Sequence, residues 1–130
     1  MSAADHEHDP AEHAAFAAEL ALGEALSGEE VADRARLLVC DLAEAAAAAG
    51  CRLIGHVKCF IRGESDDPSD HLYFSLTSLR HGATAQGALA VPARTRRLAL
   101  AAIVYGIAPE TLETLARRCI AQRFPQAQQL

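Results

Sequence analysis

The chain has 130 residues, which is about the length of one globular domain. Its 17 acidic and 12 basic residues give a formal net charge of −5, and this overall acidity argues against a nucleic-acid-binding protein. No stretch is apolar for the roughly 18 residues that a membrane helix needs, and the acidic start lacks the features of a secretory signal. We therefore expect a cytoplasmic protein.

Charge is distributed unevenly along the chain. Residues 1–50 hold 11 acids and 2 bases, whereas residues 51–130 hold 10 bases and 6 acids. One interpretation is that an acidic helical half packs on a basic sheet half. The other is that the second half presents a basic surface to an anionic partner.

The N-terminal part is predicted to be helical. Residues 1–9 have the composition of a disordered tail, and residues 125–130 are expected to form a C-terminal tail, which leaves one domain over 10–124. Asp9 and Pro10 suit the start of a helix, and Phe16 and Leu20 lie one turn apart. We expect this first helix to run to about Ala25.

A second helix is predicted over 28–49. Ser27 and Glu30 have the spacing of a capping box, and Gly50 suits the left-handed residue that ends a helix. Between them, apolar residues recur at alternating spacings of four and three, which is typical of one helical face. The two helices are expected to form a hairpin.

The periodicity then changes from that of a helix to that of a strand. Residues 51–62 and 71–79 alternate apolar and polar side chains, and the polar segment 63–70 between them suits a turn. The two segments therefore predict a β-hairpin with an acidic tip.

The last third is expected to hold a loop, a strand and a helix. Residues 81–95 contain Gly82, Gly87 and Pro92 and show no alternation. Residues 97–107 are apolar at both parities, which favours a strand covered on both faces. Pro109 then opens a helix that ends near Phe124. The expected fold class is α+β, with a helical hairpin, a three-stranded mainly antiparallel sheet and a C-terminal helix (α-α-β-β-β-α).

Three groups of residues could carry chemistry but lack a complete pattern. His6, His8 and His13 could bind a metal ion, but a flexible tail fixes ligand geometry poorly, and we expect no metal and no cofactor. The loop 82–87 lacks the glycine and lysine spacing of phosphate-binding loops. Arg94, Arg96 and Arg97, just beyond it, could hold an anion only if this loop folded over the sheet.

The four cysteines form no CxxC pair and are expected to be reduced thiols. They are Cys40, Cys51, Cys59 and Cys119. Cys59 shares the parity of Val57 and Ile61, which predicts a buried position. His56 has the opposite parity, so a Cys59–His56 catalytic pair is not expected.

The predicted hairpin brings a candidate ligand site together. If Ile61 faces Leu72, one face of the hairpin is wholly apolar, and a slip of one residue would destroy that face. The same register sets Phe60 opposite Tyr73. Four polar residues then form a square beside that pair: His56, Lys58, Ser75 and Thr77.

These observations leave three hypotheses of function. The first is a small non-enzymatic accessory or regulatory protein that acts as a homo-oligomer and binds an anionic small molecule on the sheet through His56, Lys58, Ser75, Thr77 and Tyr73. The second is an enzyme that uses His56 as acid or base and Lys58 to stabilise an anionic substrate. The third, a nucleic-acid binder, is disfavoured by the net charge and by the lack of an aromatic RNA-binding motif.

Overall fold

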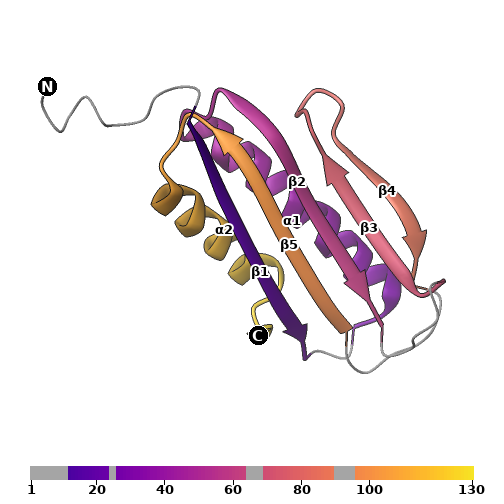
Figure 1. Ribbon diagram of the computed structural model, residues 1–130. Helices are drawn as coiled ribbons and strands as arrows, with labels where there is room; N and C mark the ends of the chain where they lie inside the picture. Colours follow the sequence, from indigo (N-terminus) through magenta and orange to yellow (C-terminus); the bar gives the residue numbers. More distant parts are fainter. Residues whose placement is uncertain (1–11, 24–25, 64–68, 90–95) are drawn as a thin grey trace, which may run out of the picture.

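A computed structural model describes residues 12–23, 26–63, 69–89 and 96–130. The described elements are β1 (His13–Leu22), α1 (Gly28–Ala48), β2 (Leu53–Arg62), β3 (His71–Leu76), β4 (Ala83–Ala88), β5 (Arg96–Tyr105), α2 (Pro109–Arg123) and β6 (Gln128–Gln129). The strands form one antiparallel sheet in the order β4-β3-β2-β5-β1-β6. Figure 1 shows both helices on the same side of this sheet.

The predicted α-α-β-β-β-α order is wrong, chiefly because the first predicted helix is the strand β1. Its even-numbered residues Phe16, Leu20 and Leu22 are buried, which is the period of a strand. Pairing with β5 along all ten residues overrides the helix propensity of its alanines. The predicted cap at Asp9 and Pro10, the tail 1–9 and the proposed helix end at Ala25 lie outside the described residues.

The sheet is also larger than the three strands predicted. Part of the predicted loop 81–95 is the edge strand β4, whose side chains are almost all exposed, so no apolar alternation marked it. The predicted strand 97–107 is β5, and it lies between β2 and β1. The expectation that β5 is covered on both faces is wrong for the described residues, because both helices lie on one face.

The second and last predicted helices and the pairing of β2 with β3 are confirmed, whereas β3 ends at Leu76 and the predicted tail 125–130 contains the short strand β6. α1 begins at the predicted capping box, in which the Ser27 hydroxyl accepts from the Glu30 backbone N–H at 3.0 Å and the Glu30 carboxylate accepts from the Ser27 N–H at 3.2 Å. Gly50 has the left-handed φ of +103° expected after a helix end. α2 begins at Pro109 as predicted. The β2–β3 register is also the predicted one, with Ile61 opposite Leu72 and Phe60 opposite Tyr73.

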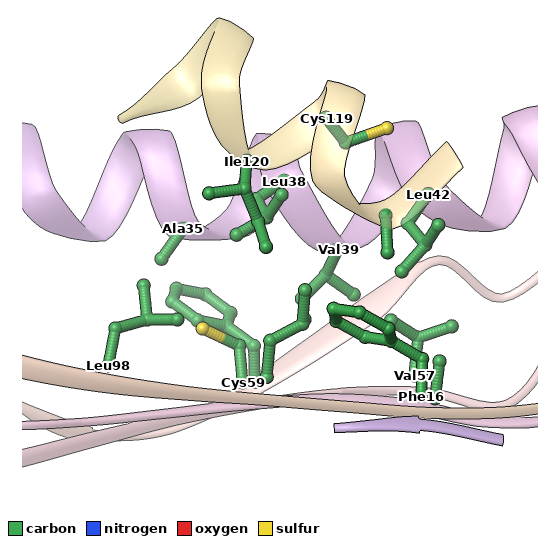
Figure 2. Packing of buried hydrophobic residues seen from close by; sticks show 14 of the residues in the cluster. Phe16, Ala35, Leu38, Val39, Leu42, Val57, Cys59, Leu98, Cys119 and Ile120 are labelled. Carbon is green, nitrogen blue, oxygen red and sulfur yellow. The ribbon is translucent and has the colours of Figure 1, made fainter. Parts of the chain in front are cut away.

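The hydrophobic core lies between the sheet and the two helices. Alternate residues of β2 and β5 face α1, including Cys59 and Leu98, and Phe16 from β1 packs beside them (Figure 2). Arg123 and Asp41 join α2 to α1 by an ion pair of 2.6 Å at the rim of this core. One face of the sheet therefore holds the core, and the other is left without a helix.

A buried carboxylate marks the end of the β2–β3 hairpin. Asp70 is only 1% exposed, and neither carboxylate oxygen has a hydrogen-bond partner among the described residues. It fits because the facing residue is glycine: a Cβ on Gly63 would lie 2.1 Å from Asp70 Oδ2. The absence of a side chain at Gly63 is therefore what makes room for Asp70.

We expect Gly63→Ala to destabilise the fold, because the new methyl group would collide with the Asp70 carboxylate. The cost should be roughly 1–3 kcal/mol in urea unfolding, and Asp70→Ala should be neutral or stabilising because it removes an unpartnered buried acid. In the double variant the Gly63→Ala cost should largely disappear. Equal costs of Gly63→Ala with and without Asp70 would show that the two side chains do not compete.

Candidate functional site: the open face of the sheet

The sheet face opposite the helices is covered by none of the described helices. We call it the open face, and it is built from alternate residues of the strands. They are His13, Ala15, Ala17, Glu19 and Ala21 (β1); Arg97, Ala99, Ala101, Ile103 and Tyr105 (β5); Leu53, His56, Lys58, Phe60 and Arg62 (β2); His71, Tyr73 and Ser75 (β3); and Thr84, Gln86 and Ala88 (β4).

The open face has two unlike halves. On β1 and the middle of β5 most of its side chains are small, and three of the five β1 positions on this face are alanine (Ala15, Ala17 and Ala21). On β2 and β3 they are long, and they include Lys58, Phe60 and Arg62. The whole face carries three basic residues against one acid, although the chain as a whole is acidic.

The structure places four of the five predicted ligand residues on this face. Lys58 lies directly between Ser75 of β3 and Ala101 of β5. Tyr73 lies opposite Phe60 as the predicted register requires. His56 is on β2 beside Ile103, just after an irregularity at Gly55, where a Cβ would come within 2.9 Å of the Ile103 carbonyl oxygen.

Thr77 is the predicted ligand residue that does not lie on the open face. β3 ends at Leu76, so Thr77 is not paired with His56 in the sheet. It is exposed and lines a separate hollow of about 230 Å³ at the end of the sheet, together with Arg52 and Ser78. The predicted polar square is therefore three residues on the open face and a fourth beyond the strand end.

The environment of His56 favours its neutral form. Partial burial, and then the positive charge of Lys58 on the same strand face, lower the pKa of His56 below its ordinary value. Of the described residues, the single acid on the open face is Glu19, on a strand that is not adjacent to β2. His56 thus has no carboxylate in the adjacent strands to orient it, as an acid–base catalyst ordinarily would have.

Sequence reasoning missed a pair of arginines on this face. Arg62 and Arg97 lie directly opposite one another on β2 and β5, and both are exposed. With Phe60, Ala99 and Glu19 they line a depression of about 230 Å³. The parity of Arg62 was evident from the sequence, but its partner depended on β5 pairing with β2. Arg96, which was grouped with Arg97, is buried instead and donates to the Leu26 carbonyl at 2.8 Å.

The cysteines and histidines of the described residues do not gather into a metal site. Cys59 is buried as predicted, and burial raises the pKa of Cys59 to about 12. Burial likewise raises the pKa of Cys119. Within the described ranges no three His, Cys, Asp or Glu side chains lie close enough to bind one metal ion, while His6 and His8 lie outside those ranges.

Comparison with known proteins gives little guidance. No family model and no curated protein matches the sequence. Among solved structures the chain is similar to the Zn(II)-bound YjiA GTPase from E. coli, with 14% identity and a TM-score of 0.39. The similarity covers 82% of this chain and 29% of the YjiA chain, and a likeness this weak supports no conclusion about fold or function. No helix within the described residues is long and apolar enough to cross a membrane.

We expect NMR titration of His56 to give a pKa below the ordinary value of about 6.5. Lys58→Gln should raise the pKa of His56 only part of the way to its ordinary value, because burial is the larger cause of the lowering. Since the folded state holds the His56 proton more weakly than the unfolded state, wild-type stability relative to His56→Gln should fall as the pH drops below about 6.5. A His56 pKa above 7 would contradict this environment.

The thiols should react in two classes. Cys40 and Cys51 are partly exposed, whereas Cys59 and Cys119 are buried and have raised pKa values. A thiol reagent at pH 8 should label two cysteines quickly in the native protein and all four after denaturation without reductant. Rapid labelling of Cys59 in the native state would show that the core is not packed as described.

Proposed function

We propose that this chain is a small non-enzymatic accessory or regulatory protein of the cytoplasm that acts as a homodimer through its open face. The observation that supports this most is that a sheet with two helices on one side leaves its whole second side uncovered by described residues. Phe60 is 36% exposed in the middle of that side. Four unpaired thiols agree with the reducing conditions of the cytoplasm.

The size of the open face suits a dimer. Five strand spacings of about 4.8 Å and a strand length of about 33 Å give a face of roughly 600–800 Å², allowing for the shorter strands. A stable interface of standard size buries about 800 Å² on each partner. The whole face therefore has an area of the expected order, and a pairing of two copies centred on β5 would cover the part of it formed by β1, β5 and β2.

The two unlike halves make the face complementary to itself. A two-fold axis running along β5 would lay β1 of one copy over β2 of the other. The small residues of β1, such as Ala17, would then oppose the long residues of β2, such as Lys58. Glu19 of one copy would lie over Phe60 of the other, between Lys58 and Arg62. Along β1 and β2 large side chains would meet small ones and the acid would meet the bases, twice in each dimer. β5, which includes Arg97, would face its own copy across the axis.

An enzyme that uses His56 and Lys58 is the alternative. It is weaker because His56 has no adjacent carboxylate, its pKa is lowered in part by Lys58 itself, and the depression on this face lies around Arg62 rather than around His56. A non-enzymatic role therefore fits the geometry better.

Ala17→Gln should weaken the dimer without unfolding the monomer. Ala17 is exposed in the single chain but would face the partner's Lys58, and overpacking an interface costs about 1–3 kcal/mol per site. We expect the dimer dissociation constant from light scattering to rise at least about tenfold.

Ala48→Gln is the matched control, because Ala48 is exposed near the end of α1, away from the sheet. A wild-type mass of 13.8 kDa at several hundred micromolar would contradict the proposal. Equal effects of Ala17→Gln and Ala48→Gln on the dimer dissociation constant would also contradict it, because an edge-to-edge contact through β4 would give that result.

A further inference from the structure

The geometry points to an anion-binding site at the Arg62–Arg97 end of the open face, for a small molecule that joins a phosphate or carboxylate to a planar ring. One chain provides the whole site, so this inference goes beyond the proposed dimer and does not depend on it. Three features support it: the opposed arginines, the exposed aromatic ring, and the depression that they share.

The opposed arginines are the first feature. Arg62 and Arg97 are direct neighbours across the β2–β5 ladder, and like charges in such positions repel one another. Arg97 is 3.7 Å from Glu19, but both side chains are about half exposed, so water screens that pair strongly. Arg62 has no ion-pair partner among the described residues. An anion between the two guanidinium groups would remove the repulsion and accept hydrogen bonds from both.

The aromatic ring is the second feature. Phe60 precedes Arg62 by two residues on the same strand face. Its neighbour on β5, Ala99, is too small to cover it, and Tyr73 flanks it on β3. His71 packs its ring against Phe60 in a tilted edge contact, with centroids 5.2 Å apart. This contact holds the Phe60 ring while leaving it 36% exposed. An aromatic ring kept partly in water beside two cations suits a ligand with a flat apolar part.

The depression joins these parts. Its volume of about 230 Å³ is lined by both arginines, Phe60, Ala99 and Glu19. A single-ring compound with one anionic group fits that space, whereas a dinucleotide would be too large for it. Glu19 disfavours an anion on the β1 side, so the charged group is expected toward Arg62 and the ring toward Phe60. In the proposed dimer the partner's Glu19 would occupy this depression, so ligand and partner would compete.

Phenyl phosphate is the probe, and its binding is measured from the changes in the amide NMR shifts. The wild type is used at concentrations where light scattering gives a monomer; if it gives none, Ala17→Gln is used instead. We expect saturable shifts at Phe60, Arg62 and Arg97, with tighter binding than inorganic phosphate or phenol. Arg62→Gln and Arg97→Gln should each weaken phenyl phosphate binding about tenfold. Phe60→Ala should reduce it to the affinity for inorganic phosphate. Arg118→Gln, an exposed arginine of α2, is the matched control and should have no effect.

Some results would overturn the site whatever the oligomeric state. If Arg62→Gln and Arg97→Gln each bind phenyl phosphate within twofold of the wild-type affinity, the anion binds elsewhere. Equal affinity for phenyl phosphate and inorganic phosphate would remove the role of Phe60. No saturable shift on this face in a folded monomer would remove the site, while failure of the dimer would appear separately in light scattering.

Discussion

The pairing of β5 with β2 on one side and with β1 on the other is the constraint on which the molecule depends. It extends over almost the full length of three ten-residue strands. Because side chains alternate along a strand, it assigns Leu98 and Leu100 to the core and Arg97 and Ala99 to the open face. A register shift of one residue on β5 would reverse both assignments.

The same pairing explains why the two faces differ in chemistry. Both helices cover one face and together with it bury most of the Leu, Ile, Val and Phe side chains of the strands (Figures 1 and 2). The open face keeps small or charged residues at most positions, which a surface in contact with water tolerates. The exceptions are the large uncharged residues Leu53, Phe60, Tyr73, Ile103 and Tyr105, and they favour a partner or ligand on this face.

Sequence periodicity predicted the elements whose packing is local or strongly patterned. The capping box at Ser27 and the register of Ile61 with Leu72 depend on neighbours close in the chain, and both were predicted correctly. The cap pattern at Asp9 and Pro10 and the one-turn spacing of Phe16 and Leu20 predict a helix where β1 lies, whereas the state of this segment is decided by β5, some eighty residues away. β4 carries almost no buried side chain, so its pairing with β3 leaves no hydrophobic pattern to read. The Arg62–Arg97 pair needed the strand order, which periodicity does not contain.

The central claim, that two copies meet through the open face with β1 over β2, can be tested by intermolecular NOEs. Equal amounts of ¹³C-labelled and unlabelled chain would be mixed at millimolar concentration, and NOEs between labelled and unlabelled protons would be recorded. A dimer through the open face should give NOEs from the Ala17 methyl group of one copy to the Lys58 side chain of the other. Intermolecular NOEs confined to β4 or to the helices would contradict it, as would a sample with none.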